Sequence, residues 1–428
     1  MKLKKTLLCL LLFFILWVFS YPVHATEEPT TYSPACLLMD MDSGKILYEK
    51  NMEEKRYPAS TTKIMTAILA LENCDLSEKA AVSHNAVYSI PSGYTTASIQ
   101  VGEEFTIEQM LYALLLPSAN DAAVVIAEHI SGSVEEFAKL MNEKAKEIGC
   151  KNTHFVNPNG IQNEDHYSTA YDLALMGRYA MQNETFRNIV ATTSYTLPAT
   201  EIYDKEDRIL VTTNDLIRSS LKDTPGNYYY PYANGIKTGY TSPAGNCIVA
   251  SAEKDGAELL VVVLGAGQTD SWESERYLDC ISLFDYGFES YTSQTLTEEN
   301  EVLQQIKIAG ATSETKNPDV LIQDQLKALV PSETNLENIE PTITLQENLK
   351  APLSKGTTVG KITYYVDGIE YSSNLILGEN VEKSSFGVLL FRILLIVFIL
   401  YIIIRLLKSL DGKKKRKKYK RLKYYEFK

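Results

Sequence analysis

YPASTTKIM, residues 57–65, is the stretch of sequence on which the fold and the chemistry both depend. Pro58 suits the start of a helix, and Ser60 precedes Lys63 by three residues, so that both side chains lie on one helix face. Two interpretations are open for the stretch alone: an ordinary helix start with a solvated lysine, or a nucleophilic serine with an adjacent base. Because Ser-x-x-Lys is common by chance, the compartment, the architecture and partner residues have to decide.

Both ends of the chain carry membrane-targeting patterns. Residues 1–25 have a basic start, an apolar run and small residues before a cleavage point after Ala25, which predicts a signal peptide. The alternative, an uncleaved anchor, is less favoured because the apolar run is short for a membrane span. Residues 386–407 are long and apolar enough to form a transmembrane helix, and Arg392 lies near its outer end. The basic residues 408–428 then predict a cytoplasmic tail and an extracytoplasmic body at the cell membrane.

The charge of the predicted exported body argues against one class of partner. The segments outside residues 26–385 carry fourteen net positive charges, so the formal net charge of −12 for the chain leaves −26 for this body. A surface so acidic is unsuited to nucleic acid, and no nucleic-acid partner is expected. The five cysteines after Cys9 are far apart and show no metal-ligand spacing, so no metal site is expected, whereas one disulfide stays open.

Within the predicted exported body, the hydrophobic pattern of residues 26–291 predicts an α+β domain. Residues 35–51 resemble a β-hairpin around Asp42-Ser43-Gly44, and residues 233–241, 245–256 and 257–267 resemble successive strands. The sequence between these two groups of strands has the hydrophobic spacing of helices. The predicted helices are residues 60–71, 106–116, 120–130 and 134–149. The pattern indicates an antiparallel sheet closed by the first and last segments and covered by a helical layer. Short alternating segments in residues 292–380 predict a small all-β domain.

Two further segments offer partners for a reactive Ser60. In LLLPSANDAA, Ser118 and Asn120 lie at a break between two predicted helices. In IKTGY, Lys237 and Thr238 lie on a predicted strand, and Gly239 removes a side chain where another backbone comes close. A lysine is a base at neutral pH only if burial and a nearby cation disfavour its charged form, and Lys237 is a candidate for that cation.

Each segment also has a purely structural interpretation. Ser60 suits the N-terminus of any helix, Ser118 and Asn120 suit a helix cap, and Lys-Thr-Gly is common at strand ends. The combination of all three, in this order and in an exported protein, favours a catalytic site. Ser-x-x-Lys, a Ser-x-Asn element and Lys-Thr-Gly are together the motif set of β-lactamases and penicillin-binding proteins.

Beyond these motifs, the chain resembles low-molecular-mass penicillin-binding proteins of the serine-type D-alanyl-D-alanine carboxypeptidase family. The resemblance extends over LLMDMDSGKILYEKN, NTHFVNPNG, HYSTAYDLALM and NGIKTGYTSPAGNCIVASA, and APLSKGTTVGKITYYVDG resembles the family's C-terminal β domain. Asn159 and Asn234 depart from the residues often seen in the family. The resemblance implies the β-lactamase/transpeptidase-like fold, removal of the terminal D-Ala from peptidoglycan stem peptides, β-lactams as covalent inhibitors, and no metal or organic cofactor.

The resemblance also implies a role for each residue of the motifs. Ser60 is the nucleophile, Lys63 its general base, and Ser118 part of the proton relay. Asn120 binds the peptide backbone, Lys237 and Thr238 hold the terminal carboxylate, and the backbone N–H groups of Ser60 and Tyr240 form the oxyanion hole.

Rival functions of the same fold stay open at this point. A class A β-lactamase needs a glutamate that activates water, for which Glu164 is the candidate, although its surroundings match the carboxypeptidase pattern. A transpeptidase or endopeptidase differs in the shape of the pocket, which the sequence does not reveal. A non-catalytic penicillin sensor is disfavoured because a pure binder has no need of Lys63.

Overall fold

A computed structural model describes residues 28–204, 208–221, 227–336, 339–384 and 386–425. These residues form two compact units. The first unit runs to Gln294 and includes Leu329–Asn335, and the second comprises Thr295–Ala328 and the chain from Leu336 onward. The predicted signal peptide lies outside the described residues.

The first unit is built on a five-stranded antiparallel sheet with the order β2-β1-β9-β8-β7. Its strands are β1 (Ala35–Asp40), β2 (Ile46–Lys50), β7 (Ala233–Thr241), β8 (Gly245–Lys254) and β9 (Ala257–Ala266). β1 pairs with β9 along its whole length, from Ala35 opposite Leu264 to Asp40 opposite Leu259. The predicted sheet, closed by segments from both ends of the domain, is therefore confirmed.

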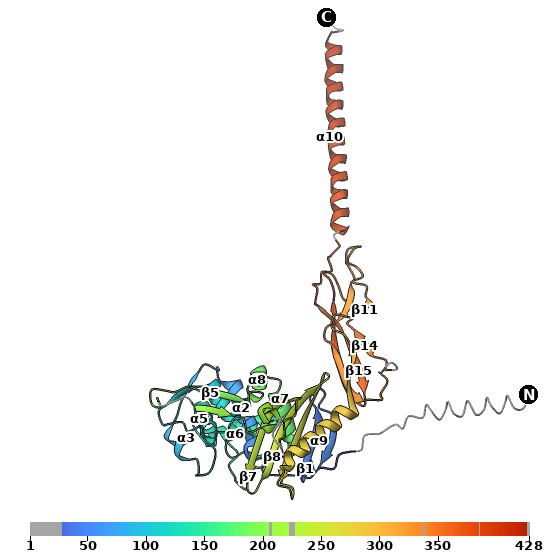
Figure 1. Ribbon diagram of the computed structural model, residues 1–428. Coiled ribbons are helices and arrows are strands. Elements are labelled where there is room, and N and C mark those ends of the chain that lie inside the picture. The colour runs from blue at the N-terminus through green and yellow to red at the C-terminus, as the bar shows by residue number, and fades with distance from the viewer. Residues whose placement is uncertain (1–27, 205–207, 222–226, 337–338, 385, 426–428) are drawn as a thin grey trace, which may run out of the picture. The chain divides into compact units, whose positions relative to one another are not determined.

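Successive side chains of β1 enter two different cores, because a strand alternates its side chains between the two faces of a sheet. Leu37 and Met39 pack with the helices that lie between β2 and β7 in the chain. Cys36 and Leu38 pack on the other face with helix α9 (Glu275–Ser290). The sheet is thus covered on both faces, as the positions of α7 and α9 in Figure 1 illustrate.

Capping signals mark one or both ends of several helices of the first unit. Besides α9, the helices of this unit are α2 (Lys63–Asn73), α3 (His84–Tyr88), α4 (Ile107–Leu115), α5 (Asn120–Ser131), α6 (Val134–Ile148), α7 (Ala170–Ala180) and α8 (Glu184–Val190). Thr106 and Gln109 form a capping box at the start of α4. Gly132 and Gly149 end α5 and α6 in the left-handed conformation that favours glycine.

Short elements complete this unit. They are the 3-10 helices η1 (Ala59–Thr62), η2 (Asp215–Ile217) and η3 (Ser219–Leu221) and the strands β3 (Lys79–Ala81), β4 (Glu104–Thr106), β5 (Ser194–Leu197) and β6 (Arg208–Val211). The predicted helix over residues 60–71 therefore differs from the structure in its first turn. Ser60 lies on the tighter turn η1, and the α-helix begins only at Lys63.

The second unit has a five-stranded antiparallel sheet of its own, with the order β11-β12-β16-β15-β14. Its strands are β11 (Val302–Gln305), β12 (Asp319–Ile322), β14 (Thr342–Leu345), β15 (Thr358–Val366) and β16 (Ile369–Leu377). Val320, Ile362 and Leu375 are central to its small apolar core. Strands β10 (Tyr291–Thr297) and β13 (Leu326–Pro331) each contain residues of both units.

The described chain ends in the long helix α10 (Phe386–Tyr425). Its segment Leu389–Leu410 has a mean hydropathy of 2.7 and is long and apolar enough to cross a membrane. No other helix among the described residues meets that test of length and composition. This segment overlaps the predicted transmembrane helix, residues 386–407, and is compatible with membrane anchoring.

Candidate active site

Ser60 lies on the turn η1, which is in close contact with the backbone at Gly160 and Gly239. Thr61 donates two hydrogen bonds to the Pro58 carbonyl, from its amide at 3.2 Å and its hydroxyl at 2.7 Å. A Cβ on Gly239 of β7 would lie 2.9 Å from the Ser60 amide nitrogen, and one on Gly160 would lie 1.9 Å from the Ala59 carbonyl oxygen. Only glycine fits at both positions, so these close approaches fix the place of Ser60.

Lys63 is completely buried one turn after Ser60 and forms three hydrogen bonds through its Nζ. The Nζ atom lies 3.1 Å from Ser60 Oγ, 2.9 Å from Asn120 Oδ1 and 2.7 Å from the Asn159 carbonyl oxygen. The last two atoms can only accept hydrogen bonds, whereas a hydroxyl can also donate. A neutral amine has two hydrogens and one lone pair, so donating to both carbonyl oxygens leaves the lone pair for the Ser60 hydroxyl.

The electrostatic surroundings favour this neutral form. Burial is the main cause that lowers the pKa of Lys63 well below its ordinary value, and the charge of Lys237 lowers it further. Asp121 acts in the opposite direction, but its effect is smaller. Lys237, the residue that the sequence offered as the neighbouring cation, therefore lies close enough to Lys63 to lower its pKa.

Ser118 and Asn120 lie at the break between α4 and α5, as the sequence predicted for this segment. The Asn120 carboxamide accepts from Lys63 and donates through Nδ2 to the Thr95 carbonyl at 2.9 Å. Ser118 has a left-handed φ of 70°, and among the described residues its buried hydroxyl has no hydrogen-bond partner. A strained backbone and an unpartnered buried hydroxyl both cost free energy and are typical of functional sites.

The Lys-Thr-Gly segment lies on β7 with its successive side chains on opposite faces, because residues of a strand alternate. Thr238 and Tyr240 line the cavity in front of Ser60. Lys237 does not line it: the side chain is buried, and its Nζ donates to the Thr238 carbonyl at 2.9 Å. Burial, with a contribution from Arg276, lowers the pKa of Lys237 to about 7. The structure thus brings Thr238, but not Lys237, to the cavity surface.

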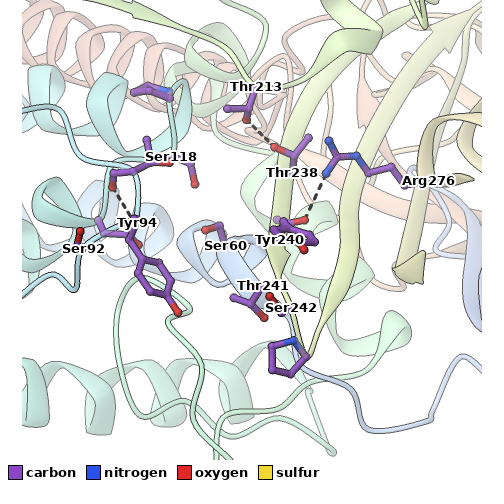
Figure 2. Close-up of a pocket in the computed structure, with 16 residues that line it drawn as sticks. Ser60, Ser92, Tyr94, Ser118, Thr213, Thr238, Tyr240, Thr241, Ser242 and Arg276 are labelled. Carbon is purple, nitrogen blue, oxygen red and sulfur yellow. Dashed lines mark hydrogen bonds between the residues drawn. The ribbon is translucent and has the colours of Figure 1, made fainter. Parts of the chain in front are cut away.

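Two residues that the sequence analysis missed also line the cavity. Arg276, in the first turn of α9, donates from Nη1 to the Gly239 carbonyl at 3.4 Å and from Nη2 to the Tyr277 hydroxyl at 3.2 Å. The Thr213 hydroxyl lies 2.6 Å from that of Thr238 (Figure 2). Neither residue belongs to a recognisable local motif, and the sheet topology alone brings them to β7.

The cavity formed by these segments has a volume of about 500 Å³ and opens in front of Ser60. Its lining comprises Ser60, Ser92, Gly93, Tyr94, Thr95, Pro117, Ser118, Asn120, Thr213, Thr238, Gly239, Tyr240, Thr241, Ser242, Pro243 and Arg276. Figure 2 shows Ser60 between Tyr94 and Ser118 on one side and Tyr240 on the other. Among these described residues hydroxyl groups predominate, Arg276 is the one charged group, and there is no carboxylate. The cavity therefore suits an anionic or polar peptide end.

Comparison with known proteins decides the family. Residues 23–268 match the peptidase S11 family model, described as D-alanyl-D-alanine carboxypeptidase. The chain belongs to the D-alanyl-D-alanine carboxypeptidase family. Residues 291–383 also match the C-terminal domain of penicillin-binding protein 5. The resemblance to low-molecular-mass, serine-type penicillin-binding proteins of the carboxypeptidase family is thereby confirmed.

Relatives in this family extend over most of the chain. D-alanyl-D-alanine carboxypeptidase DacF of Bacillus subtilis (strain 168) is 34% identical over 367 residues, which are 84% of this chain and 89% of that protein. DacC of Escherichia coli (strain K12) is 29% identical and covers 85% of this chain and 88% of its own length. Each of these alignments is longer than the first unit and therefore extends into the second.

Solved structures support the carboxypeptidase fold. DacD from Francisella tularensis, a D-alanyl-D-alanine carboxypeptidase, has a TM-score of 0.57 and 26% identity, and covers 86% of this chain and 99% of its own. PBP3 from Streptococcus pneumoniae has a TM-score of 0.70, covers 83% of this chain and 100% of its own, and at 23% identity supports the fold alone. The predicted β-lactamase/transpeptidase-like fold is confirmed.

The two departures from the family pattern have little influence on this site. Asn159 contributes its backbone carbonyl to Lys63, while its side chain accepts from the amide of Ile161. Asn234 accepts from the Ser251 hydroxyl within the sheet. Glu164, the candidate for a β-lactamase base, is exposed and does not line the cavity. This observation agrees with carboxypeptidase function and does not favour the β-lactamase alternative.

Proposed function

We propose that this carboxypeptidase removes the terminal D-Ala from peptidoglycan stem peptides through an acyl-enzyme on Ser60. The observation that carries this assignment is the hydrogen bonding of Lys63. Two of its three partners are obligate acceptors, so a neutral Lys63 directs its lone pair at the Ser60 hydroxyl, 3.1 Å away. A depressed lysine pKa and a serine within hydrogen-bond reach are the two requirements of a serine–lysine nucleophile.

In the proposed acylation, Lys63 accepts the hydroxyl proton while Ser60 Oγ attacks the carbonyl carbon of the penultimate D-Ala. The resulting oxyanion accepts hydrogen bonds from the backbone N–H groups of Ser60 and Tyr240. Collapse breaks the peptide bond, and the proton that Lys63 took from Ser60 passes through Ser118, whose hydroxyl is otherwise unpartnered, to the departing D-Ala nitrogen. Water then attacks the acyl-enzyme and gives a proton to Lys63, and Lys63 returns a proton to Ser60 Oγ as the shortened peptide leaves.

The substrate is held by groups on both sides of Ser60. Thr238 and Arg276 bind the terminal carboxylate, because a hydroxyl and a guanidinium suit an anion. Lys237 does not line the cavity; its buried Nζ donates to the Thr238 carbonyl and so helps to position Thr238 for that carboxylate. Asn120 positions the stem peptide through the second N–H of its carboxamide, since the first donates to Thr95. β-Lactams imitate the same peptide end and acylate Ser60.

The proposed location follows from the two ends of the chain. Residues 1–25 are a signal peptide, the apolar helix near residues 386–407 anchors the protein in the cell membrane once, and residues 408–428 form a cytoplasmic tail. The peptidase domain, residues 26–291, and the small β domain, residues 292–380, then lie outside the cytoplasm, where peptidoglycan is.

Reaction products separate this activity from its nearest rivals. The full-length protein in detergent is incubated with a pentapeptide ending in D-Ala-D-Ala, and released D-Ala and dimeric peptides are both measured. D-Ala release without dimers is the expected result for the wild type, with no release from Ser60→Ala. A dimeric product shows transpeptidation instead. A β-lactam adduct without any D-Ala release shows a sensor, and either result contradicts the proposal.

A further inference from the structure

Cys74, Glu78 and His129 form a cluster of side chains that the proposed reaction does not use. Cys74 directly follows α2, Glu78 directly precedes β3, and His129 lies in the last turn of α5. The Sγ atom, a carboxylate oxygen and an imidazole nitrogen of these residues all lie within 4.8 Å of one another. Glu78 Oε2 and His129 Nε2 are already 3.2 Å apart. Three different donor atoms therefore converge on one point of the surface.

The loop that carries two of these donors is held in place before any ligand arrives. The Asp75 amide donates to Glu78 Oε1 at 2.7 Å, which fixes the carboxylate while leaving Oε2 facing His129. The first two residues of α4 also hold this loop. The Ile107 amide donates to the Glu78 carbonyl at 2.9 Å, and the Glu108 amide donates to the Leu76 carbonyl at 3.1 Å. The backbone of this loop and the Glu78 carboxylate are thus already held by hydrogen bonds.

A thiolate, an imidazole and a carboxylate are the ligands that zinc prefers, whereas calcium and magnesium prefer oxygen ligands alone. Tetrahedral zinc with ligand bonds of about 2.0–2.3 Å needs its donor atoms roughly 3.3–3.6 Å apart, so closure requires side-chain shifts on the order of 1 Å. We propose that Cys74, Glu78 and His129 bind one divalent ion of the zinc class, with water as the fourth ligand.

Binding involves no change of oxidation state. The S–H bond of Cys74 breaks, a metal–sulfur bond forms, and the proton leaves to solvent. Neutral His129 coordinates through Nε2, and Glu78 through Oε2. The ion can reach the site because Glu78 and His129 are exposed and Cys74 is half-buried. Sequence spacing predicted no metal site, since Cys74 and Glu78 are four residues apart but His129 comes from a distant helix.

The proposed ion has a structural role. It joins the C-terminal ends of α2 and α5, whose first residues are Lys63 and Asn120. α2 is 11 residues long, so the ion lies about 16 Å from Lys63 along this helix. At that distance we expect the ion to raise the melting temperature but not to change the acylation rate. The proposal is thus independent of the assignment of Ser60.

Cadmium and zinc titrations of the metal-free, full-length protein in detergent test the site. We expect cadmium to produce thiolate-to-metal charge-transfer absorption that saturates at one equivalent. Zinc should protect one thiol from iodoacetamide, read by intact mass, because the other described cysteines are buried. Cys74→Ser should abolish both signals, and His129→Gln should weaken binding at least 10-fold. Glu128→Gln, beside His129 but outside the cluster, is the matched control and should bind as the wild type does.

Two results would overturn the proposal. One is the lack of any charge-transfer absorption in the wild type, and the other is metal binding of equal affinity in Cys74→Ser, which would indicate an oxygen and nitrogen site elsewhere. Penicillin acylation of each variant reports whether it is folded. A variant that still reacts with penicillin but does not bind cadmium supports the assignment of that residue.

Discussion

Replacing Asn120 with Asp tests the neutral state of Lys63 while changing the shape of the side chain very little. The amide oxygen of Asn120 lies 2.9 Å from Lys63 Nζ in a buried position. An ionised carboxylate at this place attracts a protonated Lys63 and so raises the lysine pKa. Since only the neutral amine can accept the Ser60 proton, the substitution removes the base at neutral pH.

The size of the effect follows from the separation of the two atoms. Two unit charges 2.9 Å apart interact by about 6 kcal/mol at an effective dielectric constant of about 20, equivalent to roughly four pKa units. Desolvation of the new carboxylate opposes part of this shift. We therefore expect acylation by penicillin at neutral pH to fall by about 100- to 10,000-fold. Activity is lost as the pH falls through the pKa of Lys63, and because Asn120→Asp raises this pKa, the loss should occur at a higher pH.

The assay is the second-order rate of acylation by a fluorescent penicillin, measured from acid to alkaline pH. Asn120→Ser is the matched control, because it removes the carboxamide contacts without adding a charge. A lost substrate contact lowers the rate equally at every pH, whereas a restored lysine charge shifts the acid limb of the profile. An Asn120→Asp profile with its acid limb at the wild-type pH would refute the view that Lys63 reacts as a neutral base.

Three further substitutions test the geometry around Ser60. Gly239→Ala places a Cβ 2.9 Å from the Ser60 amide nitrogen, so acylation should slow at least 10-fold while the far-ultraviolet circular dichroism stays unchanged; wild-type rates would contradict the close approach. Arg276→Gln removes the cation of the cavity, and a lost charge-assisted hydrogen bond of about 1.5–3 kcal/mol should raise KM for the peptide roughly 10- to 100-fold. The KM for a peptide with an amidated C-terminus is the control and should not change. Thr213→Val leaves the Thr238 hydroxyl without its partner at 2.6 Å, and peptide KM should rise about 5-fold, whereas Thr213→Ser should behave as the wild type.

Much of the fold was predictable because its signals are local and periodic. The hairpin formed by β1 and β2, the strands β7 to β9 and the helices α4 to α6 all follow from hydrophobic spacing and turn residues. The three motif segments were recognisable for the same reason, since Ser60 and Lys63, Ser118 and Asn120, and Lys237 to Gly239 are each close neighbours in the sequence. Their convergence depended on the family resemblance.

The remaining parts of the site depend on tertiary contacts that local patterns do not contain. Arg276 reaches the cavity because the start of α9 lies within hydrogen-bond reach of Gly239, and Thr213 because its segment before η2 lies against Thr238. The turn η1 replaces the first turn of the predicted helix, and the left-handed backbone of Ser118 has no sequence signal. One feature was available from the strand period: Lys237 and Thr238 are adjacent on β7, so their side chains have to point to opposite faces.

Peptide mapping of the acyl-enzyme tests the central claim most directly. The full-length protein is reacted with penicillin, digested, and analysed for the residue that carries the added mass. The wild type should carry one adduct, on Ser60, and Ser60→Ala should carry none. An adduct on any other residue, or covalent uptake of penicillin by Ser60→Ala, would contradict the assignment of Ser60 as the nucleophile.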